Sequence, residues 1–534
     1  MSKMRPSERR DLLGMAITIY PLEGSMAKVE AQRGLRACLL AVQADATESM
    51  WDRARETSKT LDSVDWTFLP ANCVGVNWML ELCDMLSTSG SNSQALAIAK
   101  KALSLWRLQC SQDSGNESRS RMVHTLKRLG DLQNTFGHLK DARSCFEEML
   151  QIARDLLKQF GTPQSFRDVS VSLESLGKIE KVEGNLPAAR KLFEEGLQIR
   201  RNLHKKLEIP ESLRDVSLSL NRLGDLELAE GNLPGARKLF EESLQITRQI
   251  FEQFGTPQSL KDLSTSLETL GDLEKIEGNL AVARKLFEEG LLIRRDLRGK
   301  LGTPESLRDV LLSLLKMGDI EKTEGNLPKA VEFFKESLQI RQDQIDHLKT
   351  PESMRIISLS LSRLGNMEVA QGNLVAAKTL YEECIQIRRE LCDRLRTPQS
   401  LRDISVSLNR LGDLELAEGN LPGARKLFEE SLQIRRKLSE QCGTLESLRG
   451  VWVTLNKLGE LELAQRNLAK ARLRFSESLD IARGLCKKIG MACHQKSPQY
   501  VKVVIGRKGQ NIRGDEPCRS VRVIAENTRL VRSR

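Results

Sequence analysis

The stretch Asn221–Ile246, NRLGDLELAEGNLPGARKLFEESLQI, recurs letter for letter at Asn409–Ile434. Weaker copies lie between these two stretches and on both sides of them, and each copy carries a glycine in the same place. These anchor glycines are spaced 47 residues apart, at Gly130, Gly177, Gly224, Gly271, Gly318, Gly365, Gly412 and Gly459. Self-similarity at a fixed period of this length is typical of repeat proteins. The sequence therefore predicts an array of eight clear units.

The pattern inside one unit predicts two helices. Apolar residues recur at helical spacing over residues 213–223 and again over residues 233–247. Between these runs, Gly231-Asn232 predicts the end of one helix and the start of the next. After the second run, Thr256-Pro257 predicts the start of the following unit, because a hydroxyl caps free amides and proline needs no donor there. Each unit is expected to be a helical hairpin with helices of about 20 residues, roughly 30 Å long.

The unit resembles the tetratricopeptide repeat (TPR). The residues that match the large and small positions of that family are Leu220, Leu223, Gly224, Ala236, Phe240 and Ser243. Three positions depart from the family pattern: Leu220 replaces a tryptophan, Glu227 an aromatic residue and Arg248 a proline. With the proline moved to Pro257, both helices are longer than in the usual 34-residue repeat. In this respect the unit is similar to the TPRs of kinesin light chain and related cargo adaptors.

The resemblance implies an all-α fold, a right-handed superhelical solenoid of antiparallel helix pairs. It covers residues 71–489, with one degenerate repeat ahead of the eight clear ones. Residues 1–70 show no repeat register and are interpreted as a helical cap, as such arrays require, or as the remnant of another domain. Residues 490–534 form a basic tail. Its segment Gly506, Arg507, Lys508 and Gly509 resembles the GXXG loop of a KH domain, which clamps single-stranded nucleic acid; the alternative is a disordered tail or a truncation.

Composition limits the class of protein. Of the formal net charge of +11, nine units lie in the last 48 residues, so that affinity for polyanions belongs to the tail rather than to the repeats. No run approaches the length of apolar chain that crosses a membrane. The 11 cysteines lack paired spacing and are expected to be reduced thiols. These features predict a cytoplasmic protein without a membrane segment.

Signatures of catalysis are missing from the sequence. Five scattered histidines have no recurring carboxylate or cysteine partner, and the spacing of Cys486, Cys493 and His494 fits no standard zinc site. The Glu-Glu pairs at 241–242 and 429–430 are expected to be surface charges paired with Lys238 and Lys426 four residues earlier. We therefore predict no enzyme activity, no catalytic residue, no metal, no cofactor and no small-molecule substrate.

The candidate site is a polar ladder on the first helices, which the TPR resemblance places on the concave surface. Its members stand three residues before, one after or four after an anchor glycine: Asn221, Asp225, Glu268, Asp272, Lys275, Asp319, Lys322, Asn366, Asn409 and Asp413. Packing does not require polar residues of these kinds, so we expect them to be exposed. Amides and carboxylates at such spacing are suited to gripping an extended peptide.

These observations favour a non-catalytic scaffold that binds a protein or peptide partner, of unknown identity, in the groove of a solenoid. Two alternatives remain open. One is a nucleic-acid-associated adaptor that uses the tail, and the other is a fragment of a larger signalling protein whose enzymatic domain lies elsewhere.

Overall fold

The structure is a computed structural model that describes residues 79–80, 83, 92–112, 116–342 and 351–488. Within these residues the chain forms seventeen helices and no strand, so the all-α prediction is confirmed. The first helices of the eight clear units are α6 (Asn116–Thr135), α8 (Pro163–Glu183), α10 (Pro210–Glu230), α12 (Pro257–Glu277), α14 (Pro304–Thr323), α16 (Pro351–Ala370), α18 (Pro398–Ala417) and α20 (Leu445–Ala464). The second helices are α7 (Leu139–Phe160), α9 (Leu186–Leu207), α11 (Leu233–Phe254), α13 (Leu280–Leu301), α15 (Leu327–Gln342), α17 (Leu374–Leu395), α19 (Leu421–Cys442) and α21 (Leu468–Lys488), and α5 (Asn92–Gln112) precedes them all.

Helix ends are set by the residues that the sequence singled out. Thr256 Oγ1 accepts a hydrogen bond from the Ser259 amide at 3.1 Å and so caps α12. At the turn between α10 and α11, Gly231 adopts φ +82°, a left-handed conformation that ends the helix, and Asn232 then caps α11 by accepting from the Gly235 amide. The same turn survives at Arg466, which takes φ +57° without being a glycine.

The anchor glycine holds each hairpin together. A Cβ on Gly224 would lie 2.3 Å from the ring of Phe240, so the backbone of α10 rests directly on an aromatic side chain of α11. All eight units repeat this contact, with tyrosine at Tyr381 and phenylalanine in the other seven. Only glycine permits an aromatic ring this close to the helix backbone. The period of 47 residues is therefore the period of one packing contact.

The hydrophobic core also spans the junctions between units. Ala236, Phe240 and Leu244 of α11 are buried against Leu263 and Leu267 of α12, which belongs to the next unit. The preceding and following junctions use the same positions. Each helix accordingly packs mainly against the helices before and after it in the chain, which is the packing expected of a solenoid.

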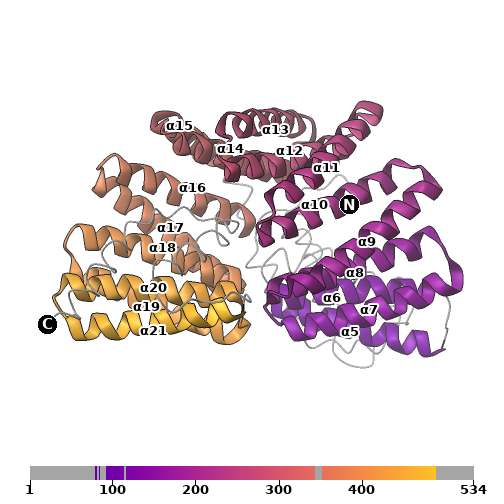
Figure 1. Cartoon of the computed structure of the whole chain (residues 1–534), viewed down its shortest axis with the longest axis horizontal. Coiled ribbons are helices and arrows are strands. Elements are labelled where there is room, and N and C mark those ends of the chain that lie inside the picture. Colours follow the sequence, from indigo (N-terminus) through magenta and orange to yellow (C-terminus); the bar gives the residue numbers. More distant parts are fainter. Residues whose placement is uncertain (1–78, 81–82, 84–91, 113–115, 343–350, 489–534) are drawn as a thin grey trace, which may run out of the picture.

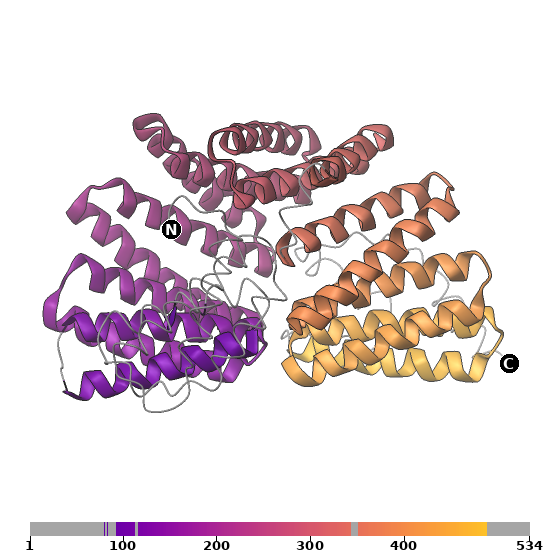
Figure 2. The same ribbon diagram turned by 180° about the vertical axis from the view of Figure 1, so that it is seen from behind.

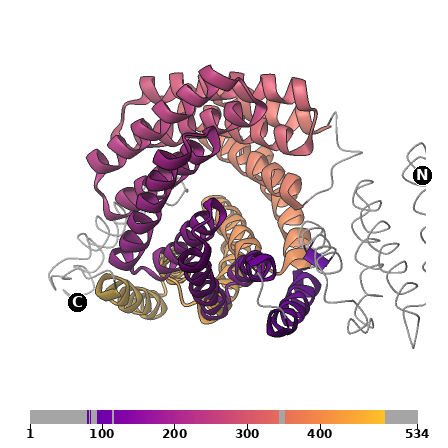
Figure 3. The ribbon, with the colours of Figure 1, turned by 90° about the vertical axis from the view of Figure 1, so that its right-hand side faces the viewer.

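Figures 1 and 2 show the helices following one another in chain order along a curved array. Figure 3, turned by 90°, shows the middle helices arching over the two ends of the described array. The curvature brings distant repeats together: a Cβ on Gly137, in the turn between α6 and α7, would lie 2.7 Å from Cys442 Sγ and 3.1 Å from Pro398. Gly184 approaches Leu445 in the same way.

The degenerate repeat is partly visible. Cys83, at an anchor position, is buried, and its thiol donates to the carbonyl of Ala95 in α5 at 3.4 Å. The proposed N-terminal cap or domain remnant at residues 1–70 and the basic tail at residues 490–534 lie outside the described residues.

The core arrangement makes a prediction about stability. Replacing Phe240 by alanine should cost about 3–5 kcal/mol, because it leaves a cavity between α10, α11 and α12. Hydrogen exchange should lose protection in those helices and their neighbours more than in α20 and α21. Phe254→Ala is the control, since Phe254 lies on the same helix but is 45% exposed, and should change stability by less than about 0.5 kcal/mol. Equal loss of protection along the whole array would contradict the prediction.

Candidate partner-binding face of the first helices

The polar ladder lies on five successive first helices, α10 to α18. Nine of its ten members are partly exposed, as a binding surface requires. The exception is Asn409, which is 2% exposed and whose amide donates to Thr454 Oγ1 of the next first helix at 3.0 Å. The expectation that Asn409 is exposed is wrong, because its side chain is used in packing between units.

Three of the ladder carboxylates are bound by cations of the following unit. Lys316 Nζ lies 2.8 Å from Asp272, Arg363 contacts both oxygens of Asp319 at 2.8 and 2.6 Å, and Lys457 contacts both oxygens of Asp413 at 2.8 and 2.6 Å. Each cation stands 44 residues after its aspartate, two residues before the next anchor glycine. The expectation that packing does not explain these aspartates is therefore wrong, since each one joins neighbouring first helices.

Asp225 is the exception among the ladder aspartates. The residue 44 positions after Asp225 is Thr269, whereas the residues 44 positions after the other three aspartates are Lys316, Arg363 and Lys457. The nearest guanidinium, that of Arg222, lies 3.9 Å from Asp225 Oδ2, and the Lys181 ammonium donates instead to the backbone carbonyl of Asp225. Partial burial raises the pKa of the Asp225 carboxyl, although Lys181 and Arg222 oppose the shift. This carboxylate lacks the close cation that its counterparts have.

The two partly exposed amides of the ladder, Asn221 and Asn366, are held differently. Asn221 Oδ1, one helical turn before Asp225, is buried and has no hydrogen-bond partner among the described residues. Asn366 Oδ1 accepts from the hydroxyl of Tyr381 at 2.7 Å. The Oδ1 atom of Asn409 also lacks a hydrogen-bond partner among the described residues, so Asn221 differs from Asn409 in being partly exposed.

Buried arginines form a second network that the sequence analysis missed. Arg294 is 7% exposed, contacts Glu268, and donates to the Ser313 hydroxyl at 2.8 Å, so that it joins α12, α13 and α14. Arg200 does the same for α8, α9 and α10 through Glu174 and Ser219. Glu268 is therefore mainly a structural residue. The signal was present in the sequence, because Arg200, Arg294 and Arg388 stand 94 residues apart, two repeats, in helices otherwise expected to bury apolar groups.

Glutamates that replace aromatic residues of the family pattern are also bound. Glu227 is 8% exposed and accepts from Arg190 and from the Asn232 amide, both at 2.7 Å. These bonds lower the pKa of Glu227, the bond from Arg190 contributing most. Recurrent glutamates at this position therefore join a second helix to the next first helix at six junctions, and the junction between α15 and α16 has Val331 in place of the cation.

The outer Glu-Glu pairs differ in detail from the expectation. Glu242 pairs with Arg201 and Glu430 with Arg389, 41 residues earlier, rather than with Lys238 and Lys426 on the same helix. These exposed pairs connect consecutive second helices and are worth little individually.

The described residues also bear on metal binding and on membrane spans. They contain no group of three metal-ligating side chains placed to hold an ion. None of the helices placed by the structure is both long enough and apolar enough to cross a membrane. Gly506, Arg507, Lys508 and Gly509, the candidate nucleic-acid residues, lie outside the described residues, as do Cys493 and His494.

Three segments of the chain match a family model described as Tetratricopeptide repeat: residues 216–254, 358–394 and 405–441. The chain carries tetratricopeptide repeats. Each matched segment runs from inside a first helix to the end of the following second helix. The resemblance to TPR arrays of the kinesin-light-chain type is thereby confirmed.

Solved structures similar to this TPR chain include BtubC (BKLC) from P. vanneervenii, with 19% identity over 50% of this chain and 94% of that one and a TM-score of 0.40. A putative kinesin light chain with nearly identical TPR-like repeats from Podosopora anserina shares 21% identity over 43% and 98%, with a TM-score of 0.32. A Rap protein complexed with Competence and Sporulation Factor shares 13% identity over 77% and 99%, with a TM-score of 0.41. No curated protein matches the sequence.

The charge network predicts a dependence of stability on pH. Burial alone would raise the pKa of Glu174, but Lys178, Arg200 and Arg222 outweigh it and lower the pKa from 4.5 to about 2. The stabilisation, about 3 kcal/mol, is present above pH 4.5 and is lost as the pH falls toward 2. Urea denaturation of Glu174→Gln should therefore show a weaker dependence on pH over this interval.

Glu195→Gln serves as the control, because Glu195 forms an exposed pair with Arg154. Its acid sensitivity should match that of the unaltered protein. A Glu174→Gln variant that loses stability in acid as steeply as the unaltered protein would show that the network around Glu174 does not hold its charge.

Proposed function

We propose that this TPR protein is a non-catalytic scaffold that binds an extended segment of a protein partner along its first helices. TPR arrays typically use a concave surface of this kind for protein–protein interaction. The observation that carries the proposal is the difference between Asp225 and Asp413. The two aspartates stand in identical copies of one 26-residue stretch. Lys457 pairs with Asp413, but the residue at the equivalent position after Asp225 is Thr269.

The chemistry of Asp225 favours a basic residue of the partner. A carboxylate whose pKa is raised by burial gains from a cation more than a fully hydrated one does. A lysine or arginine of the partner would occupy the place that Lys316, Arg363 and Lys457 occupy in their own units. Charge-assisted hydrogen bonds of this type are about twice as strong as neutral ones.

Asn221 supports the same reading. Its amide lies one turn before Asp225 on the same face of α10 and has an oxygen without a partner among the described residues. A backbone amide of an extended peptide, lying alongside the basic side chain held by Asp225, would satisfy that oxygen after a small rotation of the side chain. The two residues together would fix the register of the peptide.

The test uses the full chain in a selection from a random peptide library, followed by affinity measurements on the selected peptides. Asp225→Asn should weaken binding on the order of tenfold to a hundredfold, because one charged hydrogen bond is lost. The melting temperature of the Asp225→Asn variant should change little. Thr269→Lys should abolish binding, because it supplies from within the chain the cation that other units already have.

Asp413→Asn is the matched control. It lies in an identical stretch and should lower the melting temperature, because Lys457 loses its partner, but should leave peptide affinity unchanged. Selected peptides that carry no conserved basic residue, or that bind Asp225→Asn and Thr269→Lys as well as the unaltered protein, would refute the proposal.

A further inference from the structure

A second type of ion pair joins consecutive first helices near their N-termini. Arg167 pairs with Asp215, Arg214 with Asp262 and Arg355 with Asp403, each arginine preceding its aspartate by 48 residues. The geometry is the same each time, since the arginine Nε approaches the Oδ2 atom, at 3.3 Å in the first pair and 2.8 Å in the third. In the last two pairs a glutamine of the same helix donates to Oδ1, Gln258 at 2.9 Å and Gln399 at 2.7 Å.

Asp168 has the same surroundings without the arginine. Gln164 Nε2 donates to its Oδ1 at 2.8 Å, as in the equivalent units. The residue 48 positions earlier, however, is Ser120, whereas each of the seven later first helices carries lysine or arginine at that position. Asp168 is 4% exposed, and its Oδ2 atom has no hydrogen-bond partner in the described structure. The unpaired oxygen is the one that arginine contacts elsewhere.

A pocket of about 290 Å³ lies where that side chain would be. It is formed by α6, α7 and α8, and its walls include Glu117, Ser120, Leu156, Thr162, Gln164 and Asp168. Glu117, on α6, pairs with Arg121 at 2.5 Å. The imidazole of His124 is 56% exposed and its Nε2 lies 3.7 Å from Asp168 Oδ1, beyond hydrogen-bonding distance and on the oxygen that Gln164 already contacts.

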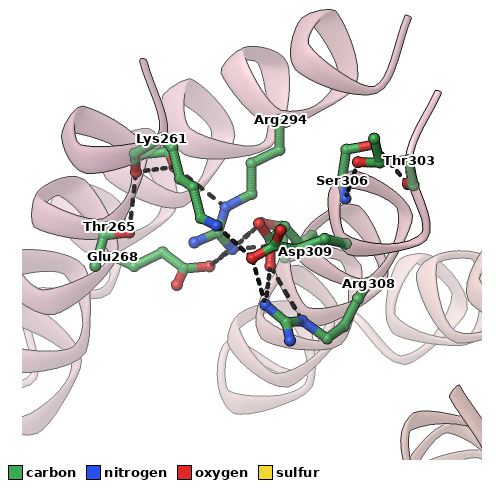
Figure 4. Close-up of polar contacts among 11 residues, drawn as sticks. Lys261, Thr265, Glu268, Arg294, Thr303, Ser306, Arg308 and Asp309 are labelled. Atoms are coloured by element: carbon green, nitrogen blue, oxygen red, sulfur yellow. Dashed lines mark hydrogen bonds and ion pairs between the residues drawn. The ribbon is translucent and has the colours of Figure 1, made fainter. Parts of the chain in front are cut away.

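Figure 4 shows how another unit fills the equivalent position, between α12 and α14. There Lys261 stands in the place of Ser120, Glu305 in that of Gln164 and Asp309 in that of Asp168. Lys261 Nζ reaches across to Glu305 at 2.6 Å. The repeat thus carries a basic side chain at this position even where it pairs with Glu305 rather than with the aspartate, and the equivalent position on α6 is Ser120.

We propose that the pocket around Asp168 binds the guanidinium group of an arginine side chain from a protein partner. The other units show the arrangement that a guanidinium adopts, with Nε on Oδ2. Leu156 offers an apolar wall for the aliphatic part of the side chain, and Glu117, which pairs with Arg121, lines the same pocket. Guanidinium is favoured over ammonium because it matches a carboxylate with two parallel donors and keeps its charge when buried.

The inference extends the proposed function to a second place in the array, and it rests on that function for its assumption of a protein partner. The two can be separated by experiment. Binding is measured in the full chain carrying Asp225→Asn, so that the carboxylate of the proposed function does not contribute. The probes are acetyl-Gly-Arg-Gly-amide, its citrulline and lysine counterparts, and methylguanidinium, titrated while the amide spectra of α6 and α8 are followed.

The arginine peptide should shift signals of α6 and α8 saturably, and the citrulline peptide, which has the same shape without the charge, should not. Methylguanidinium should occupy the same site more weakly, which distinguishes a peptide side chain from a free guanidinium compound. Asp168→Asn should reduce affinity on the order of tenfold or more, because the charged acceptor is lost. The lysine peptide should bind more weakly than the arginine peptide.

Two substitutions use the repeat itself as a control. Ser120→Arg should restore the pair found in the other units, raise the melting temperature and abolish binding of the arginine peptide. Arg355→Ser should do the reverse at Asp403, whose glutamine contact is the same, and create a second binding site. If Arg355→Ser does not fold, Ser120→Arg and Asp168→Asn still decide the question.

Equal binding of the arginine and citrulline peptides would overturn the inference. So would affinity unchanged by Asp168→Asn, or peptide binding that survives Ser120→Arg. None of these outcomes would bear on Asp225, which is tested separately.

Discussion

The contact between the anchor glycine and the aromatic ring of the second helix is the constraint on which the array depends. A ring that rests on bare backbone brings the two helices of a hairpin to a fixed separation, and the same ring also reaches the leucines of the next unit. Because one side chain serves both contacts, the shape of a hairpin and its position on its neighbour are set together. Eight copies of that geometry give a curved array whose first helices form one continuous face.

On this apolar framework lies a lattice of charged side chains that joins unit to unit. Arginine or lysine contacts acidic residues 37, 41 or 48 positions further on or 44 positions earlier, and several of these acids, such as Glu227, are buried where the family pattern has an aromatic residue. Buried pairs of this kind cost desolvation energy and contribute less than apolar packing. They do require the correct neighbour, because a unit stacked one turn out of register would bury its charges without partners. We interpret the lattice as fixing register, and we propose that a partner completes it at two of its incomplete positions, Asp168 and Asp225.

The sequence predicted the fold well, because the signals for it are local. Glycine spacing, apolar periodicity, Thr-Pro and Gly-Asn all act within one unit, and the helix ends at Phe254 and Pro257 follow from them. The candidate site was predicted less well. Asn221 and Asn409 are embedded in identical stretches, yet Asn409 is buried and donates to Thr454, whereas Asn221 is partly exposed. The difference arises from the residues of the next unit that these side chains contact. Those residues lie 44 to 48 positions away, at an offset that depends on how far one helix is displaced along another. Such offsets cannot be read from a period of 47 alone.

The approach of Gly137 to Cys442 gives the array a property that linear solenoids lack. In a linear solenoid each unit contacts only its neighbours, so no contact joins the two ends. Here two points separated by 305 residues along the chain (442 − 137) touch through a turn, a thiol and a proline ring. Stretching the superhelix would separate these two points. The described repeats therefore have a contact between distant turns, and a long partner that widened the curve would have to separate Gly137 from Cys442.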